Sequence, residues 1–390
     1  MSVEKLKASA EARAARGRLS EAIGAVFDAR GYLRVDPPIL QPADVFLDLM
    51  GEAMRADTYV FANPDGVELC LRPDLTIAAC QLYLERGAAP KEAKLWYDGA
   101  VYRHVSQQSG LSPEMRHAGV ECLGAADKEA ADAEVLSLVL DALRSAGLKT
   151  ARLRLGDLGL FSAFVDTLDL PEQWRGRLRR HFARPQDFAR LLKRLAGEEE
   201  ASEGPKALIA ALGRLSEAEA RAVVEDVLSL ADIQPIGGRT AEEIAERFLE
   251  QAADASALAL KRDTVRLIET FLAIKGAPEK ALSALRRLAK GRGKTLEAAI
   301  GRFERRLSLI ARAGIDLERA IVETSFVRAL GYYTGFIFAI EAGQGKSALP
   351  VASGGRYDKL LGALGAKREI AAVGAAISMD ALAGLGGSAR

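Results

Sequence analysis

Apolar residues are spaced for strands near both ends of the chain and for helices in its middle. Residues 18–30 carry apolar side chains at helical spacing, and Gly31 ends this predicted helix. Two alternating runs over 58–72 flank Asn63-Pro64-Asp65-Gly66, a turn sequence that predicts a β-hairpin. The prolines of 35–46 predict extended chain instead of helix. Four further elements are expected: strands at 94–105, 115–124 and 151–158, and a helix at 132–147.

Helical spacing dominates from 161 to 318. Two capping boxes, Ser216–Glu219 and Thr240–Glu243, precede apolar residues at helical spacing. Strand-like alternation returns at 322–342. Because strands and helices do not alternate strictly, a doubly wound parallel sheet fits poorly. The pattern predicts an α+β fold, in which a mixed, largely antiparallel sheet is flanked by helices.

The length of the chain sets the expected domain division. Its 390 residues exceed the roughly 250–300 residues of a single core. We expect a core domain formed by 1–160 and 319–390, and an all-helical insertion region at 161–318.

Composition narrows the possible functions. The net charge is +1, which argues against broad, non-specific binding of nucleic acid. Three cysteines and three histidines, spaced unlike a zinc site, predict no metal centre. The sequence has no run of 18 apolar residues and no apolar signal core, so we expect a cytoplasmic protein without a membrane span.

Polar side chains on or beside predicted strands suggest a pocket for a small polar ligand such as an amino acid. Carboxylates would bind an ammonium group, and a guanidinium can bind a carboxylate bidentately or reach a phosphate. Adjacent tyrosines offer aromatic packing and hydroxyl groups. Each of these residues taken alone is typical of turns, surfaces or packing, so the prediction rests on their joint occurrence. The candidates are Asp74, Thr76, Arg103, Glu121, Arg328, Tyr332 and Tyr333.

Two other segments partly match known ligand-binding motifs. Residues 343–347, GQGKS, lack the first glycine of a phosphate-binding loop, because Ile340 stands there. The stretch 175–194 holds eight basic residues and one acid. It could be a nucleic-acid face, but a solvated helix face balanced by the acidic residues that follow it fits better.

Five segments together resemble the class II histidyl-tRNA synthetases over essentially the whole chain: PPILQP, LRPDLT, YRHV…MRHAGVE, RALGYYTG and GAAISMDAL. The resemblance implies a class II aminoacyl-tRNA synthetase-like fold, with 161–318 as the insertion region. Unlike the synthetases, the sequence is expected to have no C-terminal anticodon-binding domain. RALGYYTG resembles the histidine-specific signature of that family. The candidate residues would then line a histidine pocket.

The chain departs from the synthetase pattern at four positions: Val105 for a glutamate, His117 for a glutamine, Gly331 for an acid and Ala381 for an arginine that holds ATP. Losing one preorganised contact to a transition state costs about 3–4 kcal/mol, or roughly 10²–10³ in rate. Two such losses, at Val105 and Ala381, would slow adenylation on the order of 10⁴–10⁶ if independent. The resemblance therefore implies a member without catalytic residues.

The regulatory subunits of ATP phosphoribosyltransferase are a non-aminoacylating branch of this family, and the sequence is similar to them, including its RPDLT segment. This similarity implies a part in histidine biosynthesis, without a cofactor. The implied partners are a short-form catalytic subunit, a second copy of the chain within a hetero-octamer, and L-histidine as effector. Two alternatives stay open: a stand-alone ATP-dependent amino-acid-activating enzyme, and a tRNA-binding module.

Overall fold

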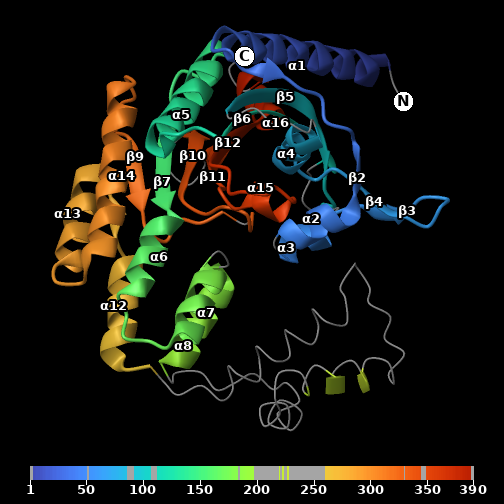
Figure 1. Cartoon of the computed structure of the whole chain (residues 1–390). Coiled ribbons are helices and arrows are strands. Elements are labelled where there is room, and N and C mark those ends of the chain that lie inside the picture. The colour runs from blue at the N-terminus through green and yellow to red at the C-terminus, as the bar shows by residue number, and fades with distance from the viewer. Residues whose placement is uncertain are drawn as a thin grey trace. The chain divides into compact units, whose positions relative to one another are not determined.

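The computed structural model describes residues 3–50, 52–85, 92–106, 112–182, 185–196, 260–328, 330–343 and 348–387, with five further residues between 219 and 227 (Figure 1). The chain forms two compact units. The first comprises Met1–Arg179 and Phe271–Arg390, and the second comprises Arg180–Thr270.

Within the described residues, nine strands of the first unit form one sheet in the order β1-β5-β6-β12-β11-β10-β7-β9-β8. Neighbouring strands are antiparallel except for the pairs β1–β5 and β7–β9. A mixed, largely antiparallel sheet was predicted, and its strands come from both ends of the chain. In sheet order the strands are Leu33–Arg34, Ala93–Tyr102, Glu114–Leu123, Ala372–Ser378, Leu349–Arg356, Phe336–Ala342, Arg152–Asp157, Ala320–Glu323 and Lys275–Gly276.

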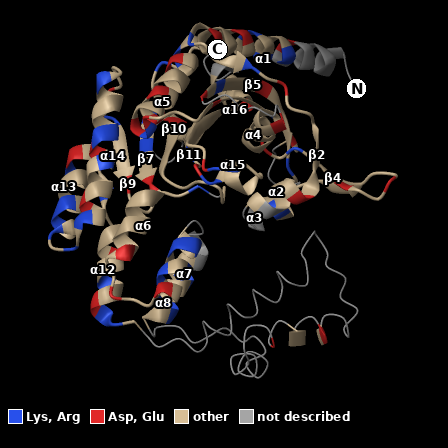
Figure 2. Cartoon of the chain, in the orientation of Figure 1, with Lys and Arg blue, Asp and Glu red and all other residues tan. Residues whose placement is uncertain are grey.

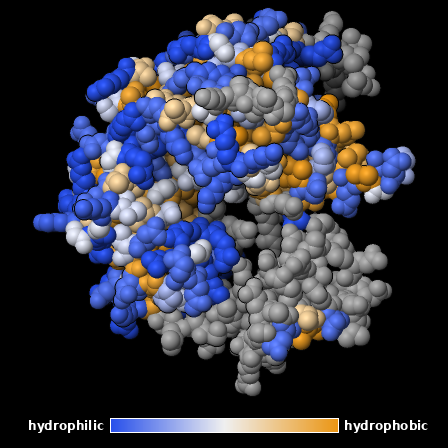
Figure 3. Space-filling model, viewed as in Figure 1, coloured by the Kyte–Doolittle hydropathy of each residue, from blue (hydrophilic) through white to orange (hydrophobic). Residues whose placement is uncertain are grey.

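A small second sheet contains the predicted hairpin. Strands β3 (Val60–Ala62) and β4 (Glu68–Leu71) pair antiparallel around the turn at Asn63, and β2 (Leu40–Pro42) pairs with β4. The side-chain oxygen Oδ1 of Asn63 accepts hydrogen bonds from the backbone of Asp65 and Val67, which fixes the turn. Several apolar side chains of the hairpin are exposed, and Figure 3 shows this apolar surface where Figure 1 places β3 and β4.

Helices of the first unit pack on the nine-stranded sheet. Helix α5 lies against α1 and α14 and contacts strands β6, β11 and β12. The helices are α1 (Val3–Ala29), α2 (Ala43–Leu49), α3 (Glu52–Ala56), α4 (Leu75–Glu85), α5 (Lys128–Ser145), α6 (Leu158–Asp166), α13 (Pro278–Ala289), α14 (Lys294–Arg312), α15 (Leu360–Ala363) and α16 (Met379–Gly387). No helix in the described parts of the chain is long and apolar enough to cross a membrane.

The second unit contains helix α8 (Pro185–Leu195), and helices α7 (Glu172–Phe182) and α12 (Arg262–Leu272) cross its boundaries. Of the region predicted as helical, α6, α13 and α14 belong to the first unit. The predicted capping boxes Ser216–Glu219 and Thr240–Glu243 lie outside the described residues, apart from Glu219.

One local prediction was wrong in part. Residues 35–42 contain no helix and include strand β2, as predicted, but α2 begins at Ala43 with Pro42 as its N-cap. Proline is tolerated there because the backbone N–H groups at the start of a helix have no partner within the helix. Helix α4 was not predicted at all. It is buried on nearly every side from Leu75 to Cys80, so it lacks the polar face that reveals a helix in a sequence.

A buried network of ion pairs joins helices α5 and α14 to the sheet. Asp132 of α5 is fully buried and accepts from Arg306 Nε of α14 at 2.6 Å and from Arg356 Nη2 of β11 at 2.6 Å. Arg306 also reaches Asp157 at 2.8 Å, and Arg356 reaches Asp358 at 2.8 Å. Each arginine thus has two carboxylate partners, which compensates for the cost of burying its charge.

We predict that Arg306→Met destabilises the fold strongly, whereas its neighbour Arg305→Met does not. Removing one member of a buried ion pair costs about 3–5 kcal/mol, because the remaining carboxylates stay buried and unpaired. Arg305 binds Asp127 and Glu129, but it is exposed and water replaces its contacts. Urea unfolding of both variants measures the difference. Equal midpoints would show that the buried network contributes little.

Candidate functional site

The carboxyl group of Glu121 lies at the centre of the candidate site. Glu121 is on strand β6, and its exposed fraction is 0%. Its Oε1 accepts a hydrogen bond from the hydroxyl of Tyr97 at 2.9 Å, and its Oε2 accepts one from the hydroxyl of Tyr357. Tyr97 comes from the neighbouring strand β5 and Tyr357 from the end of β11, so three segments distant in sequence hold one carboxyl group.

Two glycines give these side chains their space. Gly374 of β12 pairs with Glu121, and a Cβ at Gly374 would lie 1.6 Å from Glu121 Oε2. A Cβ at Gly119 would lie 2.5 Å from the hydroxyl oxygen of Tyr97. No side chain fits at either distance, so the sheet surface under the carboxyl group must be bare.

Asp74 and Thr76 lie at the start of helix α4, beside this group. Asp74 Oδ1 accepts from the backbone N–H of Ile77 at 3.0 Å, and Asp74 Oδ2 accepts from the hydroxyl of Tyr332 at 3.4 Å. The hydroxyl groups of Thr76 and Tyr97 are 3.3 Å apart. Both predicted residues therefore lie close to the group around Glu121, although Thr76 is helical and does not belong to a strand.

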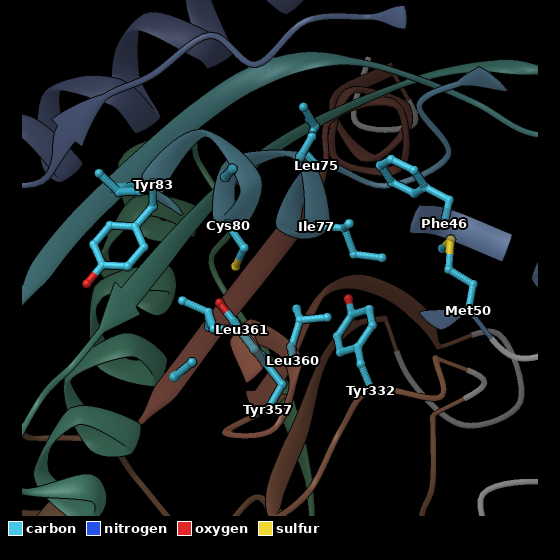
Figure 4. Close-up of a cluster of buried hydrophobic side chains, with 14 of the residues drawn as sticks. Phe46, Met50, Leu75, Ile77, Cys80, Tyr83, Tyr332, Tyr357, Leu360 and Leu361 are labelled. Atoms are coloured by element: carbon cyan, nitrogen blue, oxygen red, sulfur yellow. The ribbon is translucent and has the colours of Figure 1, made fainter. Parts of the chain in front are cut away.

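The two adjacent tyrosines pack on the same cluster. The rings of Tyr332 and Tyr333 are 4.9 Å apart, and Tyr332 lies edge-on to Tyr357 at 5.7 Å. Figure 4 shows Tyr332 and Tyr357 extending toward helix α4, with Ile77 and Cys80 on the facing side.

Strands were predicted to return at 322–342, and two are found there. Strand β9 ends at Glu323 and β10 begins at Phe336, so both tyrosines lie in the connection between them. Successive residues of a strand point to opposite faces. The irregular backbone allows Tyr332 and Tyr333 to contact one cluster together.

Arg103 and Arg328 bring positive charge to the site. Arg103 follows β5, and its Nε donates to the carbonyl of Pro73 at 2.8 Å. The Nε of Arg328 is buried, and within the described part of the chain it has no hydrogen-bond partner. Burial, Arg103 and Arg328 together lower the pKa of the His117 imidazole to about 4, which places His117 near both guanidinium groups. The carboxylate of Asp380 opposes this change, and the His117 imidazole is neutral near neutral pH.

Burial also changes the two acids. Desolvation raises the pKa of Glu121 to about 8, although the tyrosine and Thr76 hydrogen bonds oppose this change. Desolvation likewise raises the pKa of Asp74, against its backbone hydrogen bonds and the charge of Arg103. The Glu121 carboxyl is therefore largely protonated near neutral pH, and a ligand that offers it a donor or a cation would favour its ionised form.

Tyr97, Gly119 and Gly374 are site residues that the sequence prediction missed. Tyr97 carried a usable signal, because it is a hydroxyl-bearing residue in an otherwise apolar part of the strand predicted at 94–105. Tyr97 lies near Glu121 because the register of β5 and β6 places Tyr97 opposite Gly119. This register cannot be predicted from the sequence.

One departure from the synthetase motifs, Ala381, lies in helix α16. The backbone N–H of Ala381 donates to Ser378 Oγ at 3.3 Å. Its neighbour Asp380 accepts from the backbone N–H of Arg116 at 2.8 Å and from Arg16 of α1 at 3.2 Å. This end of the site thus joins α1, β6 and α16 to one another.

The family model described as histidyl-tRNA synthetase matches residues 7–244 and 223–382. The regulatory subunit of ATP phosphoribosyltransferase from Brucella ovis is 35% identical over 361 residues, which are 92% of this chain and 95% of that protein. The chain belongs to the family of ATP phosphoribosyltransferase regulatory subunits. The corresponding protein of Brucella suis biovar 1 is also 35% identical, and the alignment covers 94% of that protein. This confirms the family that the sequence motifs predicted, and membership implies partnership with an ATP phosphoribosyltransferase catalytic subunit.

Solved structures show the fold that this regulatory-subunit family shares with the synthetases. An ATP phosphoribosyltransferase regulatory subunit/histidyl-tRNA synthetase from Bacillus halodurans aligns with a TM-score of 0.64 at 20% identity, over 95% of this chain and 79% of that one. Histidyl-tRNA synthetase from Nostoc aligns with a TM-score of 0.62 at 15% identity, over 96% of this chain and 72% of that one. The class II synthetase-like fold predicted from the sequence is confirmed.

We predict that Glu121→Gln changes how stability depends on pH. Folded Glu121 keeps its proton up to a pKa of about 8, whereas the unfolded chain loses it near 4.5. Between these values the folded state binds more protons, so rising pH lowers the free energy of unfolding by up to about 1.4 kcal/mol per pH unit. The glutamine variant lacks this contribution, and its stability relative to wild type should increase from pH 5.5 to 7.5.

Urea unfolding at several pH values in this range measures the effect. Glu297→Gln, which removes an exposed carboxyl group, is the matched control and should run parallel to wild type. A parallel curve for Glu121→Gln as well would contradict the raised pKa.

Proposed function

We propose that this regulatory subunit binds L-histidine in the pocket around Glu121 and transmits its presence to a short-form ATP phosphoribosyltransferase catalytic subunit. It does no chemistry itself. It is needed for the activity of the catalytic subunit and makes that activity sensitive to the end product of the pathway. The single observation that carries this proposal is the retained set of pocket contacts in a chain that belongs to the regulatory-subunit family.

The chemistry of the pocket suits histidine. Asp74 and Glu121 can accept from an ammonium group and from a ring N–H. The buried and unpartnered Nε of Arg328 leaves a guanidinium available for the ligand carboxylate. Tyr332 and Tyr333 supply flat aromatic surface beside these groups. All seven predicted residues thus have a role in this proposal, with Thr76 and Arg103 supporting Glu121 and Asp74 through Tyr97 and Pro73.

Regulation requires that histidine bind one state of the assembly better than another. Coupling between two sites is typically about 1–3 kcal/mol. Tyr332 and Tyr333 lie in a connection instead of a strand, so a ligand could shift them without breaking the sheet. We further propose that the chain forms a homodimer within a cytoplasmic hetero-octamer and uses no cofactor, as the family resemblance implies.

The alternative is an amino-acid-activating enzyme. Arg103 and Arg328 would favour it, since both could hold a phosphate. Against it stand Val105 and Ala381, which replace two groups of the synthetase motifs. We favour regulation for that reason.

We predict that Arg328→Ala weakens feedback inhibition without preventing assembly. The wild-type chain, mixed with a short-form catalytic subunit, should support phosphoribosyl transfer that histidine inhibits. Losing a hydrogen bond to a charged group costs about 1.5–3 kcal/mol. The half-inhibitory histidine concentration should therefore rise about 10- to 100-fold. Steady-state transferase assays over a range of histidine concentrations measure this.

Arg18→Ala on the exposed face of α1 is the matched control and should keep the wild-type inhibition curve. Unchanged inhibition of the Arg328→Ala complex would place the histidine site elsewhere.

A further inference from the structure

The end of helix α13 and its connection to α14 are rich in basic residues. Between residues 280 and 294 the sequence has six basic residues and no acid. Figure 2 shows basic positions along α13 and α14. The six are Lys280, Arg286, Arg287, Lys290, Arg292 and Lys294.

A cleft of about 490 Å³ lies between the two helices beside these cations. Its floor includes Ala289, Ile300 and Gly301, and its α14 rim includes Glu297 and Glu304. Glu304 is paired with Arg286 at 2.5 Å. The side chains of Arg287 and Lys290 are exposed, and neither makes an ion pair within the described residues. The cleft therefore combines an apolar floor with two free cations.

At Gly301 the floor of the cleft has no side chain. It stands inside helix α14, and a Cβ built there would have no atom within 4 Å. Glycine lowers helix stability relative to other residues, and no neighbouring group of this chain requires it here. A side chain from another molecule could rest directly against the helix backbone at this point.

We propose that this cleft, defined by α13 and α14, is a docking surface for the catalytic subunit, which contacts it with an apolar side chain flanked by carboxylates. The inference rests on the proposed function, because it takes the partner from there. An apolar centre with a charged rim is the usual arrangement of a protein interface. The carboxylates would pair with Arg287 and Lys290, and the apolar side chain would cover Gly301.

Other occupants fit less well. The six cations are distributed over helix α13, its C-cap, the connection and the first residue of α14. That distribution is wider than a single phosphate group needs. A nucleic acid would meet Glu297 and Glu304 on the opposite rim, and the segment 273–302 has no aromatic residue for base stacking.

The test compares two variants of the full chain in binding to the short-form catalytic subunit. Gly301→Leu fills the cleft while favouring the helix, so loss of folding is not expected. The double variant Arg287→Glu with Lys290→Glu reverses the free charges. Each variant should raise the dissociation constant, measured by calorimetry, at least tenfold. The affinity of the wild type should fall as the salt concentration increases.

Matched controls are available on helix α1. Gly17→Leu replaces another exposed helical glycine whose Cβ would meet no atom within 4 Å. Arg13→Glu with Arg18→Glu makes the same change in net charge at two exposed positions. Both controls should bind within twofold of wild type.

The outcomes separate the two proposals. If the wild type binds and activates the catalytic subunit but both cleft variants match their controls, the docking surface is wrong and the proposed function stands. If the wild type neither binds nor activates, the proposed function fails first. A gel shift with RNA that only the charge variant loses, with unchanged subunit binding, would assign the surface to nucleic acid instead.

Discussion

The buried carboxyl group of Glu121 is the constraint to which the central sheet is fitted. A carboxyl group without exposure to water must be hydrogen-bonded or neutral. Here Tyr97 and Tyr357 donate to it, and its pKa is raised to about 8 by burial. The glycine at 374 clears the space that its oxygen occupies. Residues of strands β5 and β12 and of the end of β11 are thus fitted to this one side chain of β6.

The arginines near this group have two different roles. Arg356, Asp132 and Arg306 satisfy one another and join α5 and α14 to the sheet. The Nε of Arg356, like that of Arg328, has no hydrogen-bond partner within the described residues. Arg356 nevertheless binds Asp132 and Asp358 through its Nη atoms. Within the described residues Arg328 forms no ion pair, which leaves its guanidinium free to bind a ligand carboxylate in the proposed site.

The sequence predicted the antiparallel sheet, because alternating apolar residues reveal strands. It also marked polar candidates for a ligand site, of which Asp74, Thr76, Glu121 and Tyr332 lie close together in the structure. It did not predict helix α4, whose buried first half shows no amphipathic period. Aromatic residues favour strands, so the sequence around Tyr332 and Tyr333 looked like part of one strand. In the structure both side chains pack on one buried cluster, and the sequence pattern does not reveal such a tertiary contact. Tyr97 and Gly374 became site residues only through strand register, which joins positions far apart in the chain.

The central claim is that the scaffold keeps an amino-acid pocket and lacks the groups that use ATP. Its most direct test is histidine-dependent exchange of labelled pyrophosphate into ATP by the purified chain. The account predicts no exchange above the level without histidine. Exchange that histidine stimulates and that Glu121→Gln abolishes would show an activating enzyme and contradict the account.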